Sequence, residues 1–436
     1  MTCSQARGTA AILRKRGFLG MQTQLADFIR DTTEGRQADE ILRKCVHCGF
    51  CNATCPTYQL LGDELDGPRG RIYLMKQVLE GATPTARTQL HLDRCLTCRA
   101  CETTCPSGVE YGKLVDIGRN VVAQRVPRTG RDRLTRWALK TLVPNAKLFG
   151  AAMKAGRLVR GALPEKLKDK VPEARPAGVW PAPHHARRVI ALAGCVQPSM
   201  APSINAAAAR VLDALGMSMV EEAKAGCCGA LRQHLEDPQG ARDDARRNID
   251  AWWPQIARGE IEAIVMTASG CGVQVREYGY LLADDPAYAE KAARVSALTR
   301  DIGEIVAAES ETLALLLASP PGSAGKLAFH ASCTLQHGQG IRGVIEPLLA
   351  AAGFELVPVR DAHLCCGSAG TYSLLQPELA QPLRADKLAA LTEHGPVEIV
   401  SANIGCITHL EAASAVPVRH WIEALDERLA MRHQPA

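Results

Sequence analysis

The pattern of hydrophobic and polar positions changes near the middle of the chain. In the first half, apolar residues recur at helical spacing, and Ile72, Met75 and Leu79 share one face of a helix predicted over 72–79. Further helices are predicted over 25–45 and 112–124. In the second half, short apolar runs of strand length alternate with helical stretches. The pattern predicts a helical first domain followed by α/β structure.

The second half also repeats itself. Each copy has an opening strand, a helix and a closing strand, predicted at 188–192, 204–215 and 263–265, and then at 327–329, 343–352 and 398–400. A further strand is predicted at 354–359. Two copies of this order predict two tandem α/β domains with parallel strands. The predicted fold class is therefore mixed α and α/β.

Cysteine gives the first half its candidate chemistry. The run C-x2-C-x2-C-x3-C-P occurs twice among the 17 cysteines of this 436-residue chain. This run holds [4Fe-4S] clusters in two-cluster ferredoxins, and its fourth cysteine ligates the other cluster. We therefore predict two clusters, the first on Cys45, Cys48, Cys51 and Cys105, and the second on Cys95, Cys98, Cys101 and Cys55.

Other uses of these cysteines fit less well. Zinc sites usually combine two C-x2-C pairs without a third cysteine in step. A disulfide framework is typical of small secreted chains. Arg69 and Arg71 lie between the two runs, and we expect them to pair with Asp63, Glu64 or Asp66 rather than to bias a cluster potential.

Cysteines also occupy matching places in the two repeats. The copies contain Cys195, Cys227, Cys228 and Cys271, and then Cys333, Cys365, Cys366 and Cys406. These residues fall at predicted strand ends and loops, where ligands gather in α/β folds. Four thiolates suffice for a further iron–sulfur cluster or a zinc ion. Reduced thiols with a packing role are the alternative.

A glycine run in the second copy resembles a dinucleotide-binding loop. Residues 338–343 read G-x-G-x-x-G. The strand before them ends about eight residues early, and the first copy has no such glycines. Because the repeats share cysteine rather than glycine, we do not expect NAD or FAD to bind there.

Composition fits a globular protein without nucleic-acid chemistry. Hydrophobic residues make up 47% and charged residues 22% of the chain, and the low aromatic content of 4% argues against stacking on bases. The net charge of +5 is uneven, because residues 113–188 hold 18 Lys/Arg against 5 Asp/Glu. That stretch fits an acidic partner or an anionic lipid surface, and a solvated basic helix pair is the other interpretation.

Two short amphipathic helices are predicted in this basic stretch. Their apolar positions are Leu134, Trp137, Leu142, Leu148, Phe149 and Met153. Such helices lie on a membrane surface or, more often, pack on the body of their own protein. We expect the second arrangement here.

The first 20 residues are expected to be a non-native or disordered extension, with Met21 as the biological start. The run Arg14-Lys15-Arg16 resembles part of an export signal, but the residues after Met21 are polar where an apolar region is required. The predicted domains are 1–20, the extension; 21–125, a two-cluster ferredoxin-type domain; 126–186, a basic helical linker; 187–320, cysteine-rich repeat 1; and 321–436, cysteine-rich repeat 2.

From about Met21 onward, these motifs resemble a known family. The double ferredoxin run with two Cys…Cys-Cys-Gly…Cys repeats is similar to the superfamily with two 4Fe-4S motifs and two cysteine-rich CCG domains. Within it, residues 65–76, 91–94, 106–111 and 365–372 resemble the glycolate oxidase (glycolate dehydrogenase) iron–sulfur subunit. The chain departs from the heterodisulfide-reductase form of the repeat, because Gln274 and His409 stand where that form has a fifth cysteine. His409 is retained as a candidate ligand of the second repeat.

The resemblance implies an electron-transfer subunit that is inactive alone. Its expected partners are FAD-containing dehydrogenase subunits that oxidise glycolate to glyoxylate, and the quinone pool or the membrane surface, with no nucleic acid. The expected location is cytoplasmic, peripheral on the inner membrane. The alternatives are an equivalent subunit for D-lactate, glycerol 3-phosphate or heterodisulfide chemistry, and a zinc-binding interaction module.

Overall fold

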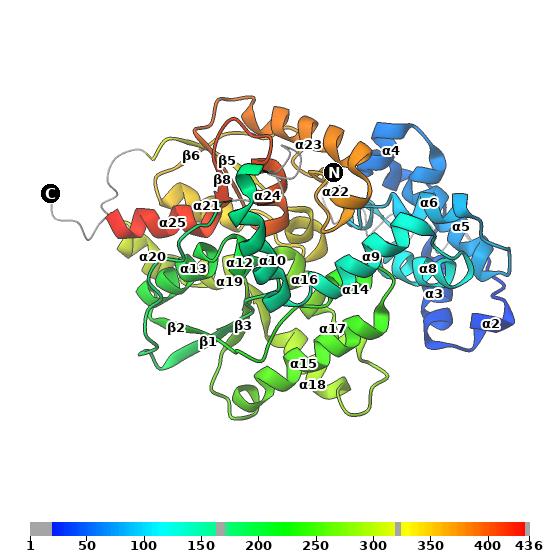
Figure 1. Cartoon of the computed structure of the whole chain (residues 1–436), viewed down its shortest axis with the longest axis horizontal. Helices are drawn as coiled ribbons and strands as arrows, with labels where there is room; N and C mark the ends of the chain where they lie inside the picture. The colour runs from blue at the N-terminus through cyan, green and yellow to red at the C-terminus, as the bar shows by residue number, and fades with distance from the viewer. Residues whose placement is uncertain (1–19, 163–170, 172, 319–323, 432–436) are drawn as a thin grey trace. The chain divides into compact units, whose positions relative to one another are not determined.

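The computed structural model describes residues 20–162, 171, 173–318 and 324–431 (Figure 1). The expected extension at 1–20 lies, apart from Gly20, outside the described residues. The chain forms two compact units: the first comprises the residues up to Arg133 together with His363–Leu383, and the second comprises the rest.

The first unit is built from helices and loops in its described part. Its elements are α2 (Asp27–Arg30), α3 (Thr33–Lys44), η1 (Phe50–Thr54), α4 (Pro56–Leu61), η2 (Glu64–Asp66), α5 (Pro68–Leu79), α6 (Ala86–Asp93), α7 (Ala100–Thr104), α8 (Tyr111–Arg125), α22 (Tyr372–Leu375) and the start of α23 (Pro377–Thr392). Helix α5 confirms the predicted face, because Ile72, Met75 and Leu79 are all buried. It starts four residues earlier than predicted, with Pro68 at a position where a missing N–H costs nothing.

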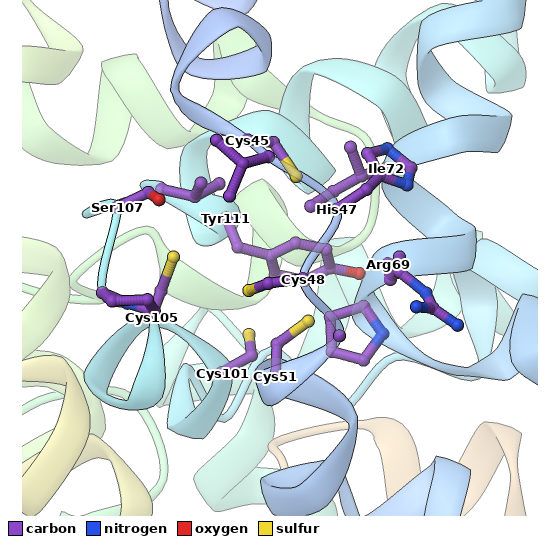
Figure 2. Close-up of a pocket in the computed structure, with 15 residues that line it drawn as sticks. Cys45, His47, Cys48, Cys51, Arg69, Ile72, Cys101, Cys105, Ser107 and Tyr111 are labelled. Carbon is purple, nitrogen blue, oxygen red and sulfur yellow. The ribbon is translucent and has the colours of Figure 1, made fainter. Parts of the chain in front are cut away.

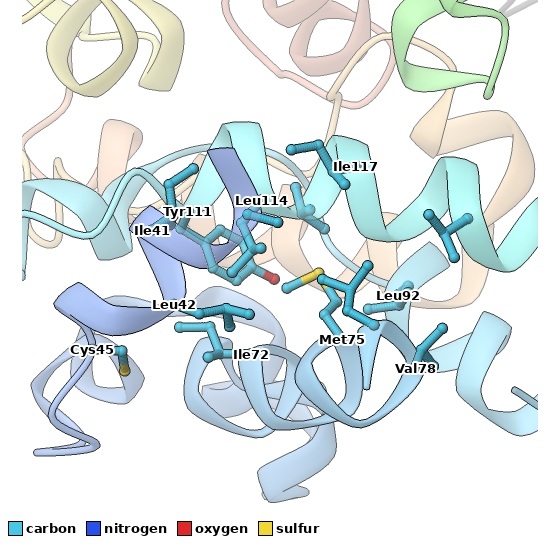
Figure 3. Close-up of a cluster of buried hydrophobic side chains, with 14 of the residues drawn as sticks. Ile41, Leu42, Cys45, Ile72, Met75, Val78, Leu92, Tyr111, Leu114 and Ile117 are labelled. Carbon is cyan, nitrogen blue, oxygen red and sulfur yellow. The ribbon is translucent and has the colours of Figure 1, made fainter. Parts of the chain in front are cut away.

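The core of the first unit lies where α3, α5 and α8 meet (Figure 3). Met75 on α5 and Leu114 on α8 are fully buried there, and Leu42 joins them from α3. Burying a side chain of this size contributes about 1.5–3 kcal/mol. This core fixes the helices from which the cysteine loops start.

The single helix predicted over 25–45 is wrong, because the structure divides it into α2 and α3. Thr32 lies between them in an extended conformation, and its hydroxyl accepts the N–H of Gly35 at 2.9 Å. This N-cap starts a new helix, as threonine does at such positions.

The second unit contains two parallel sheets, so the predicted fold class is confirmed. Its helical elements are α9 (Gly130–Leu142, beginning in the first unit), α10 (Ala146–Leu158), η3 (Arg160–Ala162), α12 (Gln197–Met200), α13 (Ser203–Ala214), α14 (Ala230–His234), α15 (Pro238–Ala257), α16 (Ser269–Arg276), α17 (Tyr278–Leu281), α18 (Ala289–Leu298), α19 (Ile302–Ala308), α20 (Ser310–Leu316), the π-helix η4 (Thr334–Gly338), α21 (Ile345–Ala351), the end of α23, α24 (Ile404–Glu411) and α25 (Trp421–Ala430).

Each sheet has four strands in the same relative order. The first runs β2-β1-β3-β4 and the second β6-β5-β7-β8. The strands are β1 (Arg187–Ala191), β2 (Met217–Glu221), β3 (Ala263–Met266), β4 (Thr299–Asp301), β5 (Lys326–His330), β6 (Glu355–Leu356), β7 (Glu398–Ser401) and β8 (Val418–His420). All described pairings are parallel, as the repeated strand–helix–strand pattern predicted. In each sheet the first strand in the sequence lies between the second and the third, so the chain crosses from one edge of that first strand to the other.

Both faces of the first sheet are covered. Ile190 and Ile264 point into a core formed with α15, α16 and α18, which includes the fully buried Trp252. Their neighbours Val189 and Val265 point to the opposite face and are also fully buried. A strand that is buried on both faces has a continuous run of apolar residues in the sequence, which explains why β1 and β3 could be predicted.

The two sheets are joined inside the second unit. Ser269, after β3, donates its N–H to the carbonyl of Ala402, after β7, at 3.0 Å. The Nε2 atom of buried His420 lies 2.8 Å from the carbonyl of Thr267, and its Nδ1 atom accepts the N–H of Ile422. These bonds fix the repeats to each other at the ends of their central strands.

Helices α9 and α10 were predicted, but the expectation for their apolar side chains was largely wrong. Leu134, Trp137, Leu142 and Leu148 are exposed, whereas only Met153 is buried and Phe149 partly so. No helix in the described ranges is both long enough and apolar enough to cross a bilayer.

Candidate functional site

Three thiols of the first cysteine run and two of the second, those of Cys101 and Cys105, line a single hollow in the first unit (Figure 2). Four of these five thiols make up the first predicted set. Cys45 follows α3, Cys48 lies in the next loop, Cys51 belongs to η1 and Cys105 follows α7. Burial raises the pKa of Cys51 to about 12, and the thiolates of the other three add to the rise. Four crowded thiols can ionise together only beside a cation, so this donor set fits the iron of an iron–sulfur cluster.

The second predicted set is also brought together, deeper in the protein. Burial raises the pKa of Cys101 well above its usual range, with further contributions from Cys98, Cys95 and Cys55. Cys55, Cys95 and Cys101 are all buried, whereas Cys45 is the one buried thiol of the first set. Each group of neighbouring thiols thus includes one thiol from the other run.

The two runs have left-handed residues at matching positions. His47 and Thr97 both have φ of 52°, and Gly49 and Arg99 follow at 81° and 60°. A left-handed conformation costs a residue other than glycine roughly 1–2 kcal/mol. It recurs here because it turns the chain sharply between successive cysteines, so that their thiols point to one place.

A fully buried arginine lies beside the second set. The guanidinium of Arg71 donates to the carbonyl of His91 at 2.7 Å and to the hydroxyl of Thr57 at 3.2 Å, and it pairs with Asp66 at 3.4 Å. The Thr57 hydroxyl lies 3.3 Å from the Cys55 sulfur. Arg71 is therefore linked to a predicted cluster ligand through one side chain.

The first set has a more exposed arginine. Arg69 pairs with Glu64 at 2.6 Å, and both side chains are more than a third exposed. The expected pairing of Arg69 and Arg71 with acidic neighbours is thus confirmed. What the sequence did not indicate is that Arg71 is desolvated next to thiols while Arg69 is in contact with water.

The segment His363–Leu383 brings part of the second repeat into the first unit. Tyr372 donates its hydroxyl to the carbonyl of Arg94 at 3.1 Å. Burial raises the pKa of Tyr372, and the thiolates of Cys95 and Cys365 both contribute to the rise. The phenol therefore lies near a thiol of the second set and a thiol of the repeat.

The first repeat brings its four cysteines together in the second unit. Cys195 follows β1, and Cys271 lies on α16, just after the neighbouring strand β3. Cys227 hydrogen-bonds with Cys195 and Cys228, and these two bonds lower its pKa. The pKa of Cys228 rises because of its hydrogen bonds with Cys227 and Cys271, with burial adding to the effect. The chain of sulfur–sulfur contacts fits one metal centre.

Two residues that the sequence analysis missed hold this loop in place. Asn248 accepts the N–H of Gly226 at 2.8 Å and donates to the carbonyl of Cys227 at 2.8 Å and to the hydroxyl of Tyr278 at 2.9 Å. That hydroxyl donates to the carbonyl of Cys228 at 2.9 Å. No sequence motif marks Asn248, because two of its three partners are backbone atoms.

The glycine of each Cys-Cys-Gly run is explained by its geometry. Gly229 and Gly367 have φ of 94° and 87°. A β-carbon at Gly367 would lie 2.6 Å from the carbonyl oxygen of Ala380, and one at Gly229 would lie 3.0 Å from that of Ala241. Only glycine meets both requirements at low cost.

The cysteines of the second repeat are divided between the units. Cys333 and Cys406 follow the neighbouring strands β5 and β7 in the second unit, and the side-chain amide of Asn403 donates to the Cys406 sulfur at 3.4 Å. Cys365 and Cys366 belong to the segment packed in the first unit. His409 is buried on α24, one turn after Cys406, and Gln274 is buried on α16, one turn after Cys271.

Comparison with known proteins identifies both halves of the chain. The 4Fe-4S dicluster domain matches residues 41–109, and the Cysteine-rich domain matches 189–276 and 327–411. The glycolate oxidase iron-sulfur subunit of Escherichia coli K12 is 53% identical over 94% of this chain and 99% of its own length. A probable glycolate oxidase iron-sulfur subunit of Bacillus subtilis 168 is 30% identical over 88% and 91%. Lactate utilization protein A of an Exiguobacterium species is 23% identical over 53% of this chain.

Proposed function

This chain belongs to the family of glycolate oxidase iron–sulfur subunits, and on that premise we propose that it carries electrons within a complex that oxidises glycolate to glyoxylate. It is an iron–sulfur electron-transfer protein of oxidoreductase type. The observation that carries the proposal is the convergence of two four-thiol sets that exchange their fourth member. Bound clusters would supply single-electron transfer, and the cysteines of this chain would hold them.

The ligand assignment follows the two thiol sets. Cys45, Cys48, Cys51 and Cys105 hold the first [4Fe-4S] cluster, and Cys95, Cys98, Cys101 and Cys55 hold the second. Their crowding, their raised pKa values and the paired left-handed turns support this assignment.

The repeats are proposed to hold metal as well. The contacts among Cys195, Cys227, Cys228 and Cys271 support a further iron–sulfur cluster or a zinc ion in the first repeat. For the second repeat, Cys333, Cys365, Cys366 and Cys406, with His409, remain the candidate set. The proposed domains are 1–20, 21–125, 126–186, 187–320 and 321–436.

Electrons enter from a partner and leave toward the membrane in this proposal. FAD-containing subunits oxidise glycolate, this chain accepts their electrons, and the quinone pool receives them. The chain alone is inactive toward glycolate, and it is peripheral on the cytoplasmic face of the inner membrane. The likeness to lactate utilization protein A, confined to about half of the chain, makes lactate the second candidate substrate.

Metal analysis tests the cluster assignment. Anaerobically purified protein should contain about eight irons if only the ferredoxin-type sets are filled, and about four more for each repeat that holds a cubane. Cys105→Ser should remove the EPR signal of the first cluster and leave that of the second. Loss of the second signal alone would refute the exchange of fourth ligands.

Reconstitution tests the substrate. With the flavin subunits and a soluble dye, the complex should reduce the dye with glycolate, and the isolated chain should not. Turnover by the isolated chain would contradict the division of labour. A much higher kcat/KM for lactate than for glycolate would show that lactate, the second candidate, is the substrate of the complex.

A further inference from the structure

Helix α9 has its apolar side facing outward. Leu134, Trp137 and Leu142 are 64%, 59% and 46% exposed. At about 100° per residue these three share one side of the helix, and Arg136 lies on the opposite side. Arg136 is buried and pairs with Glu236 at 3.3 Å, where both side chains are 8% exposed. The usual arrangement of an amphipathic surface helix is therefore inverted.

Helix α10 shows the same inversion. Leu148, Leu158 and Val159 are 47%, 88% and 53% exposed, and they share the side opposite to buried Met153. Lys147 and Lys154 are exposed beside them. We call the six apolar residues of the two helices the α9–α10 surface; they are Leu134, Trp137, Leu142, Leu148, Leu158 and Val159.

Basic residues border this surface. Lys140, Lys147 and Lys154 lie next to its apolar positions on the helical projection. They belong to the stretch that has 18 Lys/Arg against 5 Asp/Glu. This positively charged rim of lysines is complementary to an anionic surface and repels a cationic one.

Both helices are hydrogen-bonded to short helices that follow the first-repeat cysteines. The carbonyl of Lys140 on α9 accepts from Arg232 on α14 at 3.4 Å, and α14 begins directly after Cys228-Gly229. Arg157 on α10 donates to the carbonyl of Ser199 on α12 at 2.8 Å. Helix α12 begins two residues after Cys195. Both helices of the α9–α10 surface are thus tied to segments that follow first-repeat cysteines in the chain.

We propose that the α9–α10 surface docks on an anionic phospholipid bilayer. Exposed tryptophan and leucine beside lysine form the pattern of an interfacial helix, whose apolar side enters the headgroup region while its lysines meet lipid phosphates. This rests on the proposed function, because it gives the membrane contact of the same electron path. Docking would hold the segments that follow Cys195 and Cys228 on the membrane side, toward the phase in which a lipophilic electron acceptor dissolves.

Vesicle sedimentation of the full chain tests the docking. The wild-type protein should sediment with vesicles that contain phosphatidylglycerol and far less with pure phosphatidylcholine, because each lysine near an anionic surface contributes about a fivefold factor. The triple variant W137Q/L148Q/L158Q should bind at least about tenfold more weakly, since burial of one such side chain accounts for about that factor. The variant K140Q/K147Q/K154Q should lose the preference for the anionic lipid.

Matched controls make the outcomes decisive. L315Q changes a leucine that is 76% exposed on α20, outside this surface, and it should bind as the wild type does. Iron content and cluster absorbance should be equal in all variants. The proposal would be overturned if the wild type and the triple variant sedimented equally. It would also be overturned if the wild type bound equally to vesicles with and without phosphatidylglycerol. Dye reduction by the reconstituted complex is independent of vesicles, so its persistence would leave the proposed function standing if docking failed.

Discussion

Replacing Arg71 with glutamine should lower the midpoint potential of the second cluster. Reduction adds negative charge to a cluster, and a nearby buried cation favours that charge. Arg71 is 1% exposed, so water screens it little. The substitution removes the positive charge and keeps a side chain that can donate a hydrogen bond to Thr57.

The structure gives the size of the effect. The guanidinium of Arg71 lies 3.2 Å from the Thr57 hydroxyl, which lies 3.3 Å from the Cys55 sulfur. The distance from the guanidinium to that sulfur is therefore at most about 6.5 Å. Coulomb's law at an effective ε of about 20 gives about 2.5 kcal/mol, or about 110 mV for one electron. Doubling ε halves both values, so the expected drop is about 50–110 mV.

A redox titration followed by EPR measures this drop, with the first cluster as an internal reference. Arg71→Lys keeps the charge and should leave the potential of the second cluster nearly unchanged. Arg69→Gln removes an exposed charge that is paired with Glu64, and it should have little effect on either cluster. An unchanged or raised potential of the second cluster in Arg71→Gln, with both clusters intact, would refute the reasoning.

Two further substitutions test other parts of the structure. Asn248→Ala removes the amide bonds to Gly226, Cys227 and Tyr278, while the Cys227 carbonyl keeps Arg247 as a donor at 3.1 Å. Because each such bond contributes about 0.5–1.5 kcal/mol, the thermal midpoint should fall. Metal should also be lost from the first repeat, and unchanged metal content would contradict the role of the amide. Burial lowers the pKa of His420 to about 3, so the native state keeps this side chain neutral while the unfolded chain binds a proton below about pH 6.5. His420 therefore makes stability fall, by up to about 1.4 kcal/mol per pH unit, as the pH drops from about 6.5 toward 3. In His420→Gln the thermal midpoint should therefore fall less steeply than in the wild type between about pH 6.5 and pH 3. An identical dependence of the thermal midpoint on pH in both proteins would contradict this role of His420.

The parts of the site that follow local spacing could be predicted from the sequence. Ligand cysteines stand at fixed short intervals because one tight turn must present them, and both runs have the same turns at His47 and Thr97. Strands β1 and β3 were recognisable because burial on both faces makes them continuously apolar. The strands at the sheet edges were harder: the strand predicted at 354–359 is the two-residue β6 in the structure.

Contacts between a side chain and a backbone carbonyl distant in the sequence could not be predicted. Asn248 and Tyr372 act on carbonyl groups, and a carbonyl is present at every residue, so no side-chain pattern records the pairing. The expectation for α9 failed for another reason. Periodicity shows that a helix has an apolar side, but the direction of that side depends on what lies beneath, and here the buried position belongs to Arg136, paired with Glu236.

The contribution of His363–Leu383 to the first unit has a consequence for biosynthesis. Tyr372 and Arg94 are separated by 278 positions. At about 5–20 residues per second, a ribosome needs on the order of tens of seconds to add that length of chain. The ferredoxin-type loops therefore leave the ribosome long before the segment that covers Arg94 exists. A fragment that stops at residue 125 lacks this cover permanently, and a cluster inserted before residue 372 is synthesised would lie in a unit that is still incomplete.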